Sequence, residues 1–207
     1  MKRVIGISVA VIAFLLFSVI AYATTIFVSD DPVILYNSLG NYYFKLGDSS
    51  KAKEFFEKAL TLDPNNAKAS HNLGVIYYVQ KDLASAKHYF EQAILFDANY
   101  EKAHYSMALV LIDESDLENA LTHLQKVAQI NPKNVNAQFD LAVVHVELFR
   151  KKEISDQLLS SDLELLIKGI EHYNTVLALN ENFPDARSNR DIVMQVLKDY
   201  EQQIMQQ

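Results

Sequence analysis

Cysteine is absent from the 207-residue chain, and glycine (five residues) and proline (four residues) are scarce. Without cysteine there is no disulfide framework, no cysteine-based zinc site, no thiol nucleophile and no bacterial lipobox. The six histidines form neither an i, i+4 pair nor a His-Glu-x-x-His motif, the arrangements that favour a metal on a helix. No glycine-rich phosphate loop is present, and no serine or threonine has an adjacent His-acid pattern. The sequence therefore predicts no cofactor, no metal site and no enzymatic activity.

Positive charge is also in the minority. The formal net charge is −7, and beyond Val28 there are 17 basic residues against 26 acidic residues, a balance of −9. Such a surface repels nucleic acid and anionic lipid headgroups. We therefore expect no nucleic-acid partner.

The N-terminal segment Val4–Val28 carries no charged residue. As a helix it would be roughly 37 Å long, enough for a bilayer core of about 30 Å. It therefore predicts a single-pass transmembrane anchor at 1–28, with Lys2 and Arg3 cytoplasmic and the rest extracytoplasmic. The alternative is a signal peptide cleaved after Ala23, because Ala21-Tyr22-Ala23 has a small-x-small pattern, and a secreted or periplasmic product.

The remainder of the chain repeats itself every 34 residues, counted from Val33. Two columns of the repeat occur in the first half of each row: Leu39, Leu73, Met107, Leu141, and Gly40, Gly74, Ala108, Ala142. A third column there reads Tyr43, Tyr77, Leu111, His145. The second half of each row gives Ala52, Ala86, Ala120, then Phe56, Phe90, Leu124, then Ala59, Ala93, Val127, with Pro64 and Pro132 near the row ends.

Within a row, apolar residues fall at helical spacing in two blocks separated by a polar break, so each row predicts two helices of about four turns. Small residues such as Gly40 and Ala52 allow the two helices to approach closely, and Tyr43 and Phe56 fill the space beside them. One such pair cannot bury its apolar face alone, whereas stacked pairs can.

These columns resemble the tetratricopeptide repeat (TPR). The resemblance implies an all-α fold: an N-terminal transmembrane helix, a short linker at 29–32, a right-handed α-solenoid of about four helix pairs at 33–183, and a C-terminal capping helix at 184–207. The expected repeats are 33–66, 67–100, 101–134 and 135–183. The last contains an insertion near 150–164, since Gly169 stands about 15 residues late.

Local signals refine three of these boundaries. Asp31 and Pro32 suit the N-cap and first position of the first helix. In the fourth row the first helix should run to about Lys152, and Ser161-Asp-Leu-Glu164 has the pattern of a capping box that starts the second helix near Asp162. Beyond Pro184, apolar residues on one stripe and polar residues on the other predict a solvent-facing cap.

The resemblance also implies a concave groove lined by the first helix of each pair. Some family members use such a groove to hold a peptide carboxylate, and Asn41, Asn72 and Lys102 match three of the five positions involved, but Asn37 and Ser106 replace the cations expected at the other two. Because the groove positions are mostly apolar, we expect it to bind apolar or aromatic side chains, with hydrogen bonds from Asn41, His71 and Lys102. The predicted groove residues are Asn41, Phe44, His71, Val75, Tyr78, Lys102, Tyr105, Leu109, Ile112, Phe139 and Val143.

The sequence thus predicts a non-catalytic, membrane-anchored scaffold or assembly adaptor whose groove binds a peptide or helix of a protein partner. Two alternatives are a self-assembling structural subunit, which would be a homo-oligomer, and an accessory subunit that docks a membrane or envelope enzyme.

Overall fold

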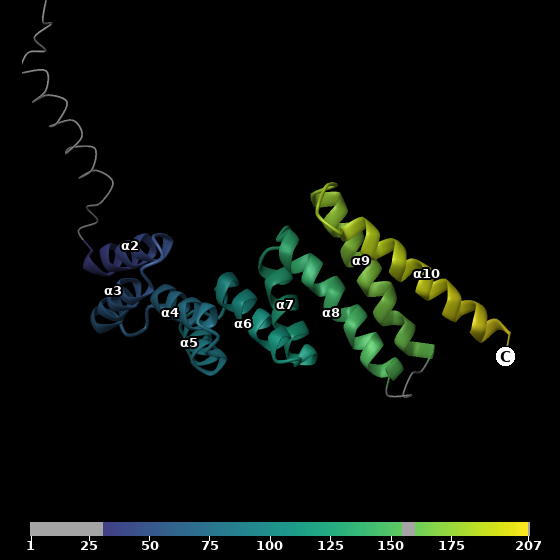
Figure 1. Ribbon diagram of the computed structural model, residues 1–207, viewed down its shortest axis with the longest axis horizontal. Coiled ribbons are helices and arrows are strands. Elements are labelled where there is room, and N and C mark those ends of the chain that lie inside the picture. Colours follow the sequence, from purple (N-terminus) through teal and green to yellow (C-terminus); the bar gives the residue numbers. More distant parts are fainter. Residues whose placement is uncertain (1–30, 155–159, 207) are drawn as a thin grey trace, which may run out of the picture. The chain divides into compact units, whose positions relative to one another are not determined.

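A computed structural model describes residues 31–154 and 160–206 (Figure 1). Within these ranges the chain forms nine α-helices and one short 3-10 helix, and no strand. The helices are α2 (Pro32–Lys45), α3 (Ser49–Leu62), α4 (Ala67–Val79), α5 (Leu83–Phe96), α6 (Glu101–Asp113), α7 (Leu117–Ile130), α8 (Val135–Ile154), η1 (Ser160–Asp162), α9 (Leu163–Leu179) and α10 (Ala186–Met205). The fold is therefore the TPR-type succession of helices that the repeat predicts.

The chain divides into two compact units between Ala69 and Ser70. The first unit contains the α2–α3 hairpin. At its start, the Asp31 side chain accepts a hydrogen bond from the Val33 backbone N–H at 2.8 Å, and Pro32 opens the helix, which confirms the predicted cap. The second unit contains α4 from Ser70 onward and the helices after it, in which α6 packs against α7 and α8 against α9.

A repeated turn separates the two helices of each of the first three hairpins. Its N-cap aspartate accepts a hydrogen bond from a backbone N–H three residues later, and the residue before it has a positive φ. The caps are Asp48, Asp82 and Asp116; the positive-φ residues are Gly47 (80°), Lys81 (64°) and Ser115 (62°). Both sets recur at intervals of 34 residues, so local chemistry ends and restarts the helix at the same place each time.

The fourth hairpin lacks this turn. The equivalent positions hold Phe149 and Arg150, which supply no cap, and α8 continues to Ile154, two residues beyond the predicted end. The predicted start of the second helix near Asp162 is confirmed, since α9 begins at Leu163 with Asp162 as its N-cap. The predicted capping box is wrong, because the N-cap is Asp162 and not Ser161, and the Asp162 side chain makes no capping hydrogen bond. Instead, its carboxylate lies 2.5 Å from Lys152 Nζ, which joins the end of α8 to the start of α9.

Small and large residues alternate through the cores of the hairpins. Phe90 is fully buried against Gly74, and in the next hairpin Leu124 and Ala108 are fully buried. In the fourth hairpin, a Cβ on Gly169 would lie 3.0 Å from Val146 Cγ2, so the glycine permits the close approach of α8 and α9.

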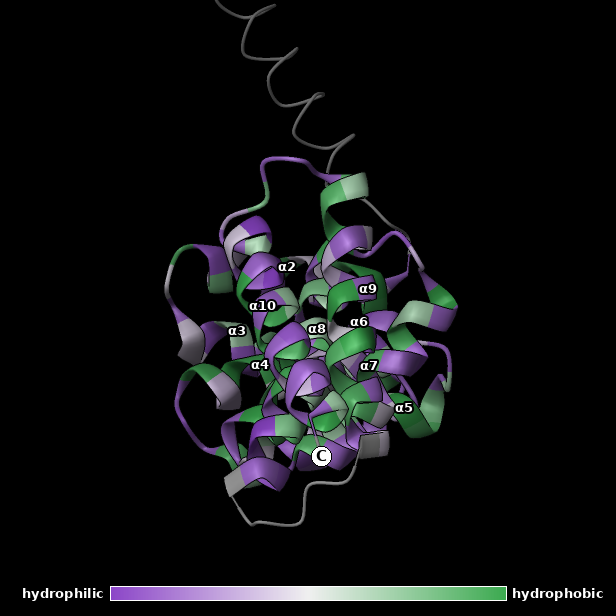
Figure 2. Cartoon of the chain, turned by 90° about the vertical axis from the view of Figure 1, so that its right-hand side faces the viewer, coloured by the Kyte–Doolittle hydropathy of each residue, from purple (hydrophilic) through white to green (hydrophobic). Residues whose placement is uncertain are grey.

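Helix α10 packs against α9, and α8, α9 and α10 lie side by side in Figure 1. Val193 is buried, Val196 and Leu197 are half-buried, and the ring centroids of Phe149 and Tyr200 lie 5.4 Å apart. Figure 2 shows mostly hydrophilic residues along α10. The apolar side chain of Ile192, on the same helix, is 60% exposed.

The localisation prediction requires correction. In residues 31–154 and 160–206 no helix combines the length and apolar character needed to cross a bilayer, so a single-pass membrane protein is not supported. The segment on which that prediction relied, 4–28, and the alternative cleavage site after Ala23 lie outside the described residues.

Candidate functional site

Side chains from successive first helices are joined in the second unit by hydrogen bonds between residues 35 positions apart. The Tyr78 hydroxyl of α4 donates to Asp113 Oδ2 of α6 at 2.9 Å. The Tyr105 hydroxyl of α6 donates to Asp140 Oδ2 of α8 at 2.8 Å. His71 Nε2 of α4 lies 3.1 Å from Ser106 Oγ of α6. Because one repeat is 34 residues, a residue 35 positions later lies one position beyond the equivalent position in the next repeat. These bonds therefore join the first helices of neighbouring repeats.

The two tyrosine–aspartate pairs fix the orientation of the tyrosine rings while leaving them half-buried. Burial raises the pKa of the Tyr105 hydroxyl, and the charge of Asp140 and the hydrogen bond to it raise this pKa further. The pKa of the Tyr78 hydroxyl is also raised, first by burial and second by its hydrogen bond to Asp113 and the charge of that carboxylate. Both hydroxyls therefore stay protonated and keep donating to their carboxylates.

The two carboxylates differ in their surroundings. Asp113 lies 3.9 Å from Lys81 Nζ and is exposed. Asp140 is half-buried and, within the described part of the chain, has no ion-pair partner; its hydrogen-bond donor is Tyr105. Burial raises the pKa of Asp140, and the tyrosine hydrogen bond only partly opposes this. A half-buried carboxylate with one neutral donor is a favourable place for an added cation.

We call the surface formed by the half-buried groove side chains of α4, α6 and α8 the tyrosine strip. Its members are Val75, Tyr78, Tyr105, Leu109, Ile112, Phe139, Val143 and the carboxylate of Asp140. Two other predicted groove residues lie on the same helices. Lys102 is exposed, whereas His71 is only 7% exposed and burial lowers its pKa to about 4. Its ring nitrogens face Asn72 and Ser106, so His71 acts here as a contact between helices.

The α8 end of the strip packs against the C-terminal part of the chain. The Phe139 ring lies 5.0 Å from the Phe183 ring and 5.7 Å from the Tyr173 ring, centroid to centroid. Val143 lines a cavity of about 220 Å³ together with residues of α10, among them Val193. The most open part of the strip therefore lies on α4 and α6.

The remaining predicted groove residues, Asn41 and Phe44, belong to α2 in the first unit, where both are half-buried. Asn37 of the same helix is buried, and its amide donates to the Val33 carbonyl at 3.1 Å and to Asn66 Oδ1 at 3.3 Å. Asn37 therefore joins α2 to the turn after α3.

Sequence reasoning missed the three hydrogen bonds that Asp113, Asp140 and Ser106 make to groove residues, although it had placed Ser106 at a carboxylate-binding position of the groove. Each of these residues is one position beyond a predicted groove residue in its own row, and each bonds to the groove residue of the preceding row. A search for complementary polar pairs at the repeat length plus one would have found all three.

Comparison with known proteins supports the repeat. Three family models, each described as a tetratricopeptide repeat, match residues 33–66, 55–88 and 101–134. The chain therefore contains tetratricopeptide repeats. A 39-residue stretch is 51% identical to a protein of Pyropia yezoensis described as "Uncharacterized protein ycf37"; it covers 19% of this chain and 22% of that relative. The match thus spans about a fifth of the relative's length.

Solved structures share the fold, and two of them are described as TPR proteins. YrrB, described as "a TPR protein with an unusual peptide-binding site", has a TM-score of 0.64 at 22% identity, over 80% of this chain and 78% of that one. PilF of Pseudomonas aeruginosa has a TM-score of 0.67 at 20% identity, over 83% and 71%. The first TPR of Spaghetti (RPAP3), bound to the HSP90 peptide SRMEEVD, has a TM-score of 0.55 at 25% identity, over 58% and 98%.

Proposed function

We propose that this protein is a non-catalytic interaction scaffold and that the tyrosine strip binds an extended or helical segment of a partner protein. The observation that carries the proposal is the set of tyrosine rings held in place by aspartates on the neighbouring repeat. Rings that are already oriented lose little conformational entropy on binding. Tyrosine is also enriched among residues that dominate binding energy.

The chemistry of the strip indicates what the segment should present. Leu109, Ile112 and the tyrosine rings suit apolar side chains, and the Asp140 carboxylate suits a lysine or arginine beside them. A charge-assisted hydrogen bond of this kind is stronger than a neutral one. The peptide-binding site described for YrrB and the HSP90 peptide bound by the Spaghetti repeat support a peptide-binding role by analogy of fold.

A photo-reactive amino acid at Leu109, on α6 in the strip, tests this proposal in cells that make the protein. The control position is Thr122, which is exposed on α7. We expect a discrete adduct from position 109 and none from position 122. Tyr78→Ala combined with Tyr105→Ala should remove the adduct while the far-ultraviolet circular dichroism stays helical. Equal adducts from both positions, or an adduct that survives the two substitutions, contradict the proposal.

The segment recovered by mass spectrometry then tests the part assigned to Asp140. As a synthetic peptide, it should bind Asp140→Asn about tenfold more weakly than the unaltered protein, a loss of about 1.4 kcal/mol. The difference should shrink at high salt. Equal affinities would remove Asp140 from the site and leave the apolar contacts as its basis.

A further inference from the structure

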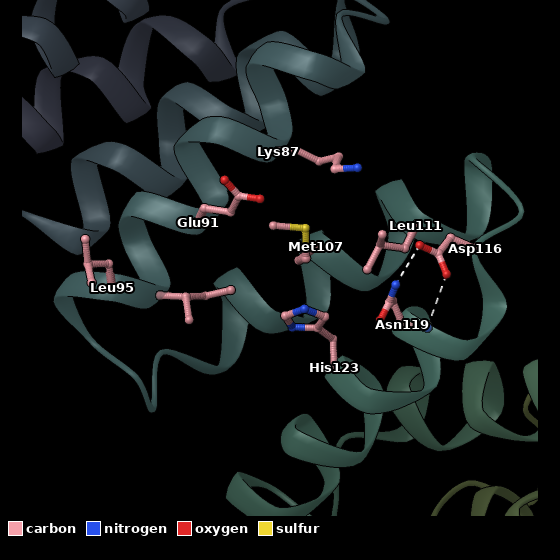
Figure 3. Close-up of a pocket in the computed structure, with 9 residues that line it drawn as sticks. Lys87, Glu91, Leu95, Met107, Leu111, Asp116, Asn119 and His123 are labelled. Atoms are coloured by element: carbon pink, nitrogen blue, oxygen red, sulfur yellow. Dashed lines mark hydrogen bonds between the residues drawn. The ribbon is translucent and has the colours of Figure 1, made fainter.

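Outside the tyrosine strip, a hollow of about 490 Å³ lies between α5, α6 and α7 (Figure 3). Two of the polar side chains that line it, Asp116 and His123, are already paired within the chain. Asp116 accepts a hydrogen bond from the Asn119 amide at 2.8 Å, and Nδ1 of His123 lies 3.0 Å from Nδ1 of His104. These groups are satisfied without a ligand.

A groove of about 310 Å³ between α9 and α10, here called the α9–α10 groove, has charged groups that lack such partners. Its lining includes Ile167 and Ile170 of α9 and Met194, Leu197, Lys198 and Glu201 of α10. Ile167 and Met194 are each 37% exposed. Within the described helices, neither Lys198 nor Glu201 forms an ion pair, although they are only three residues apart.

One exposed stripe of α10 has the same spacing in both directions along the helix. Its residues are Met194, Lys198, Glu201 and Met205, at successive intervals of four, three and four. At about 100° per residue, these side chains fall within an arc of about 60° and share one face of the helix. Met205 is 82% exposed, and the other three residues are exposed as well. Intervals of this kind place side chains along the seam between two packed helices.

The stripe is complementary to itself. A two-fold axis across α10, midway between Lys198 and Glu201, exchanges these two residues and also exchanges Met194 with Met205. In an antiparallel pair of α10 helices, Lys198 of each copy therefore faces Glu201 of the other, and each methionine faces a methionine. Every contact occurs twice, as in an isologous interface. A parallel pair in register would instead place like charges opposite each other, which is repulsive.

We propose that the α9–α10 groove binds the α10 helix of a second copy of this chain, in antiparallel orientation, to form a symmetric dimer. The self-complementary charges and spacing of the stripe select a second copy as the occupant. Ile167 and Ile170 add apolar surface to the same groove. The dimer does not depend on the function proposed for the tyrosine strip, which lies on α4, α6 and α8.

Introduced cysteines test which positions meet, because the full chain contains none of its own. Met194→Cys and Met205→Cys are made in separately tagged copies of the full chain, mixed, and mildly oxidised. We expect a disulfide-linked pair in the mixture, since the two positions face each other. Either variant alone should give little, because two copies of one position lie about 16 Å apart along the helix axis.

Asp199→Cys is the matched control. Asp199 is exposed and lies close to the proposed axis along the chain, but it is turned about 100° from Lys198 around the helix. It should therefore form no disulfide. No product in the mixture, equal products from either variant alone, an equal product from Asp199→Cys, or a disulfide to a different protein would each overturn the proposal. Association through another part of the chain does not reproduce this pattern of positions.

Charge reversal tests the ion pairs on the same cysteine background. Lys198→Glu in both copies places two carboxylates opposite each other twice, so the protein concentration needed for half-maximal cross-linking should rise at least about tenfold. Glu201→Lys should have the same effect, and the two reversals together should restore the original value. Unchanged cross-linking in either single variant, or a double variant no better than the single ones, would refute the antiparallel pairing, provided that the circular dichroism stays helical.

Discussion

The contact between Gly74 of α4 and Phe90 of α5 offers a test of how the hairpins are packed. A Cβ at position 74 would lie 2.5 Å from Phe90 Cε1 and 2.6 Å from Cδ1. Phe90 is fully buried, so its ring has no free space to move into. For Gly74→Ala, the ring and the helix must therefore separate by about 0.9 Å to restore an ordinary contact of about 3.4 Å.

Two effects of opposite sign determine the result. Alanine in a helix interior is more favourable than glycine by about 1 kcal/mol. Overpacking a buried site costs about 1–3 kcal/mol, and the fixed ring places this site toward the upper end. We expect Gly74→Ala to lower the free energy of unfolding by about 1–2 kcal/mol, whereas the same substitution in an open helix would raise it.

The third hairpin supplies the compensating change, because it carries Ala108 and Leu124 at the same two positions, both fully buried. The double variant Gly74→Ala, Phe90→Leu reproduces that pair in the second hairpin. We expect the double variant to lose about 1–2 kcal/mol less unfolding free energy than the two single variants lose together. A coupling of this size is within the range for residues in contact.

Urea unfolding of the full chain, followed by circular dichroism at the helical band, measures all four proteins of this cycle. A Gly74→Ala variant that is as stable as the parent or more so would refute the packing argument. Additive single effects would equally show that positions 74 and 90 do not share the space that the structure assigns to them.

Two further predictions concern stability. Burial lowers the folded-state pKa of His71 to about 4 from an unfolded value of 6.5. The stability that comes from keeping this imidazole neutral is therefore fully present above pH 6.5 and is lost as pH falls toward 4. At pH 5 the loss is about 2 kcal/mol, so a His71→Gln variant should show a shallower fall in unfolding free energy between pH 6.5 and 4.5; parallel curves would contradict this. Ser115 has a φ of 62°, so Ser115→Gly should stabilise the protein by about 0.5–1 kcal/mol in thermal unfolding, and a destabilised variant would show that the turn gains nothing from glycine.

The repeat of helix pairs could be predicted from sequence because its causes are local. Residues such as Gly74 and Phe90 recur at a fixed spacing, and a helix must begin near Asp82 and end before Asp97 whatever lies around it. The same reasoning placed the first helix after Asp31. At Ser161 the motif predicted the start of the helix correctly, but the capping box itself is not formed.

The chemistry of the surfaces depended on contacts that periodicity does not describe. The groove prediction named Tyr78 and Tyr105 but did not foresee that Asp113 and Asp140 would hold their hydroxyls. Such a pair forms only when two helices from different repeats lie side by side at the right height. Hydropathy likewise predicted a membrane span that the described helices do not provide.

The sequence by itself therefore determined that the chain folds as TPR-type helical hairpins, because each helix pair can bury its apolar face only by packing against a neighbouring pair. Only the tertiary structure decided which side chains stay accessible, and it showed that Asp113 and Asp140 accept hydrogen bonds from the tyrosines of the preceding repeats. The physical reason is that a cross-repeat hydrogen bond depends on atoms from two helices of different repeats, whereas helix formation depends on neighbours along the chain.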